Sequence, residues 1–182
     1  GVMAADAMAL GGGRLSELSA ATVTRLDKIL PRTWSRANPV DIIGDAPVER
    51  YVETLKLLAE DSQVDAVLFL HAPTAIVAAD AVATACAPVA AGARCPVLGC
   101  WLGDRAVAAA RRIFHEAGIE DYGTPEEAVN AFLRRVTFRR NQEALIETPP
   151  ASPIDFSPDR PSVQRILAAA LDEGREMLTE PQ

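Results

Sequence analysis

Aromatic side chains are scarce in this chain: Phe, Trp and Tyr make up 5% of its 182 residues. The core must therefore be built mainly from aliphatic side chains, as in helices packed on a sheet. No apolar run reaches the length of a membrane span, and no stretch has the pattern of a signal peptide. We expect a cytoplasmic globular protein with no membrane partner.

Basic residues are also in short supply. The formal net charge is −7 and the acids and bases are interspersed along the chain. A partner with a phosphate backbone requires a basic face, so the charge argues against nucleic acid.

Cysteine and histidine are too few and too scattered for a metal site. Cys86, Cys95 and Cys100 contain no CxxC spacing, and His71 and His115 have no carboxylate at ligand spacing. Reduced, buried thiols are the simplest interpretation of the cysteines.

Several catalytic and nucleotide-binding motifs are missing. The sequence contains no GxSxG, no Walker loop and no GxGxxG. The glycines at 11–13 do not follow a strand, so they are interpreted as the end of a helix rather than a phosphate-binding loop.

What the sequence does contain is an alternation of apolar strands and amphipathic helices. Such alternation favours a parallel sheet between helix layers. We predict an α/β domain over residues 1–138, a doubly wound, flavodoxin-like parallel sheet with helices on both faces. The expected helices are 2–10, 19–30, 48–60, 78–91, 104–116 and 124–136, and the expected strands are 15–18, 64–70, 96–100 and 119–122.

The C-terminal part has a different composition. Five prolines fall between residues 148 and 161, which predicts a Pro-rich linker over 139–160. Residues 161–182 are expected to contain one more amphipathic helix, to about Leu178. An amphipathic helix after such a linker normally packs on something else, so we expect a piece of a larger protein.

Asn38, Asp41 and Gly44 lie in a short apolar segment that is expected to end a strand. Asn38 precedes a proline and is therefore biased toward extended geometry, and an acid within an apolar strand is unfavourable unless it is hydrogen-bonded. One interpretation is a polar rim that faces a ligand. The alternative is that Asp41 only caps a turn.

Two further loops are expected at the carboxyl ends of strands, where open parallel sheets bind ligands. The first contains His71, Pro73, Thr74 and Ala75 and leads into a helix, whose amino end favours a phosphate. The second contains Gly103. The alternative for the first loop is a plain strand-to-helix turn. His71 could be a phosphoryl carrier or general base, or a hydrogen-bonded structural group.

Several motifs together resemble one enzyme family, in matching order over nearly the whole chain. They are Asn38-Pro-Val-Asp-Ile-Ile-Gly-Asp-Ala-Pro-Val-Glu-Arg-Tyr51, the strand 64–70, Cys100-Trp-Leu-Gly103, and Glu116-Ala-Gly-Ile119 with Tyr122-Gly-Thr-Pro-Glu126. The chain is similar to the third subdomain of the NDP-forming acyl-CoA synthetases, which is like the CoA-ligase domain of the succinyl-CoA synthetase β subunit.

The resemblance implies a reaction for the whole protein. Acyl-CoA, ADP and phosphate would give the acid, CoA and ATP through an acyl phosphate and a phosphohistidine. That histidine belongs to the preceding subdomain, so His71 would not be it. CoA, ADP or ATP and Mg²⁺ are expected in the whole protein and no cofactor in this part, which alone would be inactive. The implied partners are CoA-binding and ATP-grasp domains, and a homo-oligomer is left open.

Other segments resemble one branch of the family more closely. They are Trp34-Ser35, His71-Ala-Pro-Thr-Ala-Ile76 and Arg139-Arg-Asn-Gln142 with Glu147-Thr-Pro-Pro150. This branch comprises bacterial protein lysine acetyltransferases, in which a synthetase-like half often serves regulation. A non-catalytic regulatory or scaffolding module is therefore the alternative function. The family's first strand and its Gly-Gly-Gly-Pro loop are expected ahead of Gly1.

Overall fold

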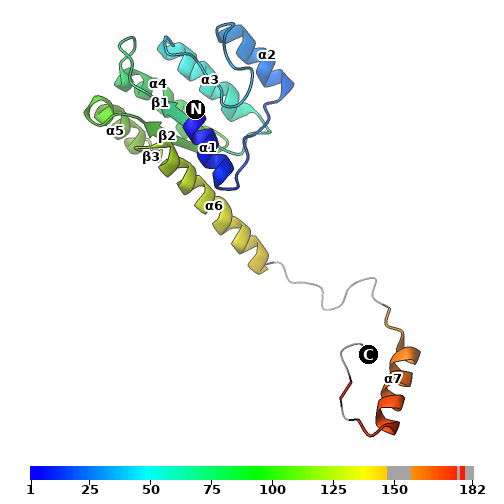
Figure 1. Cartoon of the computed structure of the whole chain (residues 1–182). Coiled ribbons are helices and arrows are strands. Elements are labelled where there is room, and N and C mark those ends of the chain that lie inside the picture. The colour runs from blue at the N-terminus through cyan, green and yellow to red at the C-terminus, as the bar shows by residue number, and fades with distance from the viewer. Residues whose placement is uncertain (147–156, 176, 179–182) are drawn as a thin grey trace. The chain divides into compact units, whose positions relative to one another are not determined.

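The computed structural model describes residues 1–146, 157–175, 177 and 178. The chain divides into two compact units, Gly1–Asn141 and Gln142–Gln182. The first unit contains the sheet and carries the candidate site (Figure 1). The second contains the helix α7 (Arg160–Asp172).

Three parallel strands form the sheet of the first unit. They are β1 (Val67–His71), β2 (Val97–Trp101) and β3 (Asp121–Tyr122), and they lie in the order β1-β2-β3. The register pairs Val67 with Val97 and His71 with Trp101. The α/β class with a parallel sheet is confirmed.

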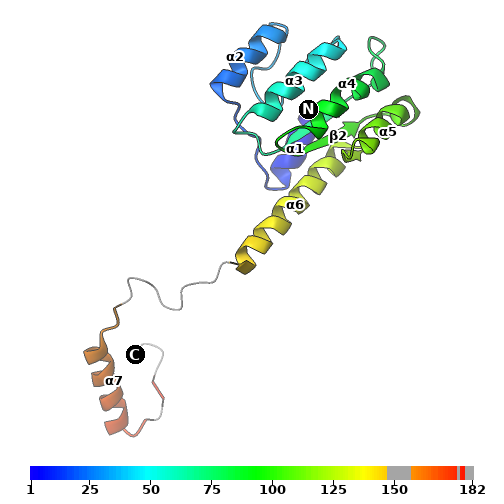
Figure 2. The same cartoon turned by 180° about the vertical axis from the view of Figure 1, so that it is seen from behind.

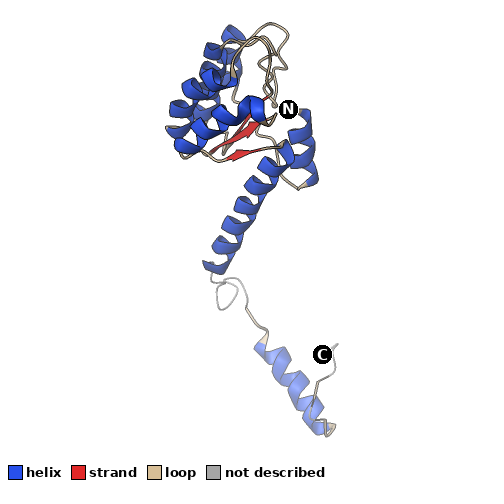
Figure 3. Cartoon of the chain, turned by 90° about the vertical axis from the view of Figure 1, so that its left-hand side faces the viewer, coloured by secondary structure: helices blue, strands red, loops and turns tan. Residues whose placement is uncertain are grey.

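Helices cover both sides of this sheet (Figure 3). The helices α3 (Val48–Glu60), α4 (Ala79–Ala91) and α5 (Ala108–Glu116) pack on one face. The helices α1 (Val2–Leu10) and α6 (Pro125–Ile146) lie at the other face. The helix α2 (Ala20–Ile29) packs on the outside of α3, beside which it lies in Figure 1 and Figure 2.

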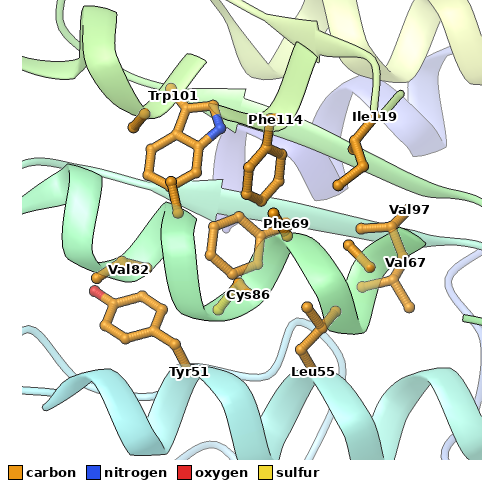
Figure 4. Packing of buried hydrophobic residues seen from close by; sticks show 14 of the residues in the cluster. Tyr51, Leu55, Val67, Phe69, Val82, Cys86, Val97, Trp101, Phe114 and Ile119 are labelled. Atoms are coloured by element: carbon orange, nitrogen blue, oxygen red, sulfur yellow. The ribbon is translucent and has the colours of Figure 1, made fainter. Parts of the chain in front are cut away.

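The main core lies between the sheet and the layer of α3, α4 and α5 (Figure 4). Phe69 of β1 packs at 5.6 Å from Phe114 of α5, ring centroid to centroid. Alternate residues of a strand point to opposite faces, so Leu68 and Leu70 face α1 and α6 instead. The three cysteines are free and buried, as predicted.

The ends of several helices follow the sequence signals. Ser19 caps α2 by accepting the Thr22 N–H at 3.2 Å. Thr124 and Glu127 form a reciprocal capping box at the start of α6. After α5, Gly118 adopts a φ of +75°, and the Ile119 N–H donates to the Phe114 carbonyl at 2.9 Å, which is the pattern of a Schellman motif.

The strands β1 and β3 begin later than the expected residues 64 and 119. Three helix boundaries also differ from the expected ones. The helix α6 continues to Ile146, so the expected linker segment 139–160 begins inside a helix. The helix α7 ends at Asp172 rather than near Leu178. Asp104 precedes a short 3₁₀ helix, η1 (Arg105–Val107), and makes no side-chain cap hydrogen bond there. Residues 147–156 of the expected linker lie outside the described residues.

Two segments that were expected to be extended strands are not. Residues 15–18 and 38–44 are in neither helix nor strand. A strand needs a neighbour to satisfy its backbone groups, and in the described part of the chain β1 pairs with β2 only. Neither segment pairs with a strand of this sheet in the described structure.

No helix among the described residues combines the length and the apolar composition that crossing a bilayer requires.

Candidate functional site

Two loops meet where β1 and β2 end. A Cβ added to Gly103 would lie 3.3 Å from Pro73 Cγ, so the loop after β2 packs directly on the loop after β1. Gly103 has a φ of +98°, which a residue with a side chain rarely adopts. The structure thus brings together Pro73 and Gly103, two of the predicted site residues.

The loop after β1 leads straight into α4. Its Thr74 Oγ1 accepts the Ile76 N–H at 3.4 Å, which holds a local turn. Ala78, the N-cap residue of α4, provides no side-chain cap, so the first backbone N–H groups of the helix point toward this loop. Together with the helix dipole, they make the amino end of α4 favourable for a negative charge.

An acidic side chain already lies in that first turn. Asp80 Oδ1 accepts the Ala81 N–H at 2.9 Å. A carboxylate near a helix amino end stabilises the helix, but it also repels a second anion. The loop is therefore a moderate rather than a strong anion site.

His71 does not lie in the loop where the sequence placed it. It is the last residue of β1, it is 1% exposed, and its ring lies between those of Tyr51 and Trp101. Burial lowers the pKa of His71, so the imidazole is neutral. In the described structure neither ring nitrogen has a hydrogen-bond partner. The expected loop position is wrong, because His71 belongs to the strand.

Asn38, Asp41 and Gly44 lie in the segment before α3, and no hydrogen bond found among the described residues joins them to the loops after β1 and β2. Asn38 Nδ2 donates to the Ser16 carbonyl at 3.0 Å, and Asp41 Oδ1 accepts the Ile43 N–H at 2.9 Å. Asp41 thus caps a turn, which was the alternative to a ligand role. Both residues line a cavity of about 580 Å³ beside β1. Gly44 has no neighbouring atom within 4 Å of an added Cβ.

Arg50 holds the 42–45 segment in place by hydrogen bonds. The sequence carried only a weak signal of this role. Arg50 Nη1 donates to the Ile42 carbonyl at 3.0 Å and to Asp45 Oδ1 at 2.8 Å. The signal was an Arg in the first turn of a helix, five residues after an acid. Ile43, within this segment, has a φ of +65°, which is strained for a β-branched side chain.

Comparison with known proteins identifies the family. The profile of the Ligase-CoA domain matches residues 1–145. The chain belongs to the Ligase-CoA domain family. Its expected resemblance to the CoA-ligase domain of the NDP-forming acyl-CoA synthetases is thereby confirmed.

Curated relatives agree with this assignment. The acetate–CoA ligase (ADP-forming) I of Archaeoglobus fulgidus is 34% identical over 176 residues, which cover 96% of this chain and 24% of that protein. Subunit alpha of acetate–CoA ligase (ADP-forming) II of Pyrococcus furiosus is 29% identical over 78% of this chain and 32% of the subunit. The chain spans about a quarter of the first relative's length and about a third of the second's.

A solved structure matches the fold. The dinucleotide-forming acetyl-coenzyme A synthetase 1 of Candidatus Korarchaeum cryptofilum, in complex with phosphate and ADP, superimposes with a TM-score of 0.75. It is 28% identical, and the match covers 82% of this chain and 33% of that chain. The parallel sheet with its helices is thus a domain of an acyl-CoA synthetase-like fold.

In this Ligase-CoA domain, the described residues around the loops of Pro73 and Gly103 offer no nucleophile or acid–base pair. Burial raises the pKa of the Cys86 thiol to about 12 and that of the Cys100 thiol to about 11. His71 is enclosed by aromatic rings. In the described part of the chain, no group of three or more His, Cys, Asp or Glu residues could hold a metal ion.

Proposed function

We propose that this domain forms one wall of a phosphoryl-transfer site in an NDP-forming acyl-CoA synthetase-like protein. The observation that carries the proposal is the contact between Pro73 and Gly103. It fixes the 72–77 loop at the strand ends, with the amino end of α4 behind it. A phosphorylated histidine from a neighbouring domain would approach this loop.

The reaction would convert acyl-CoA, ADP and phosphate to the acid, CoA and ATP. Phosphate displaces CoA from the acyl group, and the phosphoryl group then passes through a histidine of another domain to ADP. The amides of the 72–77 loop and of the first turn of α4 would stabilise the phosphoryl charge by about 1 kcal/mol or less, since Asp80 opposes it. CoA, the nucleotide and Mg²⁺ would be held by the neighbouring CoA-binding and ATP-grasp domains.

The test is a steric block in the whole protein. Thr74→Trp fills the loop with an indole, and we expect the rate of ATP formation from acetyl-CoA, ADP and phosphate to fall at least about tenfold. Thr84→Trp is the matched control, because Thr84 is exposed on α4, ten residues after Thr74. If both variants keep the wild-type rate, the loop does not face the reaction.

A second candidate function is a non-catalytic module in a protein lysine acetyltransferase. It is favoured by Asp80, which lowers the affinity of the rim for a phosphoryl group. In that case the whole protein acetylates a lysine substrate and forms no ATP from acetyl-CoA, and Thr74→Trp leaves acetylation unchanged. ATP formation would exclude this candidate.

A further inference from the structure

His71 lies where the sheet meets the loops of the candidate site. It is the last residue of β1, and its carbonyl accepts the Leu102 N–H at 2.9 Å. Gly103 follows Leu102 directly, and Pro73 comes two residues after His71. The backbone of His71 therefore joins the loop after β1 to the loop after β2.

The imidazole of His71 is enclosed without a polar partner. The ring of Tyr51 lies 5.6 Å from it and that of Trp101 5.0 Å, centroid to centroid. His71 is 1% exposed, and neither ring nitrogen has a hydrogen-bond partner in the described part of the chain. A positive charge on this ring would lose its hydration and gain no hydrogen bond in return, which strongly disfavours the charged form.

The surrounding elements offer no counter-ion for such a charge. Tyr51 of α3 and Cys86 of α4 are buried, and burial raises the pKa of each, so both are neutral near pH 6. Burial is the cause of the lowered pKa of His71, with no contribution from a charged neighbour among the described residues. The charged side chains that these elements carry at this end of the sheet are exposed or, in Arg50, bound to an acid; they are Glu49, Arg50, Asp80, Asp104 and Arg105.

We propose that His71 is an acid-sensitive latch between the two loops of the candidate site. When the imidazole takes up a proton, it leaves its place between Tyr51 and Trp101 for water, and the loops 72–77 and 102–104 separate. Loss of the proton closes them again. This opening concerns the chain alone, whereas its consequence, the withdrawal of one wall of the phosphoryl-transfer site in acid, rests on the proposed function.

The position of His71 at the end of its strand makes the opening local. Its release breaks the hydrogen bond from Leu102 at the last register pair and leaves the earlier pairs, such as Val67 with Val97, in place. Pro73 and Gly103 on the two loops are exposed, so little apolar surface has to be uncovered there. Segments with few buried contacts open at a lower free energy than the core.

The test is backbone hydrogen exchange of the chain, measured by NMR at pH 7, 6 and 5. The Leu102 amide reports on the latch, and the Val67 amide, which donates to the Pro96 carbonyl at the other end of β1, is the reference. The protection factor, which is the intrinsic exchange rate divided by the measured rate, should be lower for Leu102 than for Val67. Because the opening takes up one proton, the Leu102 value should fall by up to about tenfold for each pH unit below 6.

Two substitutions assign this pH dependence to one histidine. His71→Leu keeps an apolar side chain between the rings but carries no titratable group, so the Leu102 protection factor should no longer depend on pH. His115→Leu, at an exposed position of α5, is the matched control and should keep the wild-type dependence. The wild-type comparison of Leu102 with Val67 needs no variant, so it decides the question even if His71→Leu fails to fold.

Three results would overturn the latch. They are a Leu102 protection factor that equals that of Val67 at every pH, one that stays constant between pH 7 and 5, or the same pH dependence in His71→Leu as in the wild type. The first result would mean that His71 meets water only when the whole domain unfolds.

The consequence for the reaction is measured separately, as ATP formation by the whole protein from acetyl-CoA, ADP and phosphate at pH 7 and 5.5. His71→Leu should lose a smaller fraction of its rate in acid than the wild type. If the Leu102 amide opens in acid but both proteins lose the same fraction, the latch stands and the 72–77 loop is not part of the reaction site.

Discussion

The imidazole of His71 lies 5.0 Å from the indole of Trp101, ring centroid to centroid, at directly opposed positions of β1 and β2. Both side chains are almost fully buried, and their ring nitrogens have no hydrogen-bond partner within the described structure. This pair closes the core beneath the loops of the candidate site.

The buried histidine makes stability depend on pH. Because the pKa of His71 is lowered in the folded chain from its ordinary value of 6.5, the unfolded chain binds more protons below that pH. The free energy of unfolding should therefore fall as the pH drops from 7 toward 5, by at most about 1.4 kcal/mol per pH unit.

His71→Leu should remove this dependence, which urea unfolding at several pH values would measure. His115→Leu, at an exposed position of α5, is the matched control and should keep the wild-type slope. An unchanged slope in His71→Leu would show that His71 protonates as freely in the folded chain as in the unfolded one.

Asp61 should make the free energy of unfolding depend on pH in a second, more acidic range. Burial would raise its pKa, but hydrogen bonds from the Gln63 and Ser19 N–H groups and from the side chains of Thr22 and Ser19 outweigh burial and hold the pKa at about 2. Since the folded pKa lies below the ordinary 3.8, this stabilisation is present above pH 4 and is lost as the pH falls through 2.

Asp61→Asn should lower the free energy of unfolding by about 2 kcal/mol at pH 7, with a smaller difference from wild type at pH 2. Acid and urea titrations followed by circular dichroism measure both values. A difference that is the same at the two pH values would contradict the assignment.

A side chain at position 103 should lower the stability of the domain. Gly103→Ala places a methyl group 3.3 Å from Pro73 at a φ of +98°, so we expect a loss of about 1–2 kcal/mol in the free energy of unfolding. Gly44→Ala is the control, because Gly44 has open space around it and no left-handed φ, and it should change stability by less than about 1 kcal/mol. Equal effects of the two substitutions would mean that the two loops do not pack as described.

The thiols should be inert until the domain unfolds. Cys86 and Cys100 are 0% exposed, and burial raises the pKa of both thiols to about 12 and 11. We expect Ellman's reagent to react with neither cysteine at pH 8 in the native chain, and with all three cysteines in denaturant. Rapid labelling of either residue in the folded chain would show that this part of the core is open.

Most of the fold could be predicted because its signals are local. The apolar faces of α3 and α5, the capping box of Thr124 and Glu127, and the glycine that ends α5 depend on residues a few positions apart. The predicted end of α6 at Val136 was too early. The charged run that follows carries no stop signal, so the helix continues to Ile146.

The errors concern features that depend on distant partners. Residues 15–18 have strand composition but pair with no strand of the described sheet. His71 was assigned to a loop because it follows an apolar run. Only the pairing of its carbonyl with the Leu102 N–H places it in the strand.

The site was predictable only in part, for the same reason. The rim formed by Pro73, Thr74 and Gly103 follows from the rule that loops gather at the carboxyl ends of parallel strands. The sequence could not show that Asn38 and Asp41 line a cavity beside β1, because their positions depend on Ser16 and on the edge of β1.

The central claim is that the 72–77 loop and the amino end of α4 receive a phosphorylated group. Hydrogen exchange by mass spectrometry, in the whole protein with and without Mg-ATP, tests it most directly, with intact mass recording phosphorylation. Phosphorylation should slow exchange over residues 72–81 and leave 108–116 of α5 unchanged. A protein that is phosphorylated but exchanges at the same rate over 72–81 would contradict the claim.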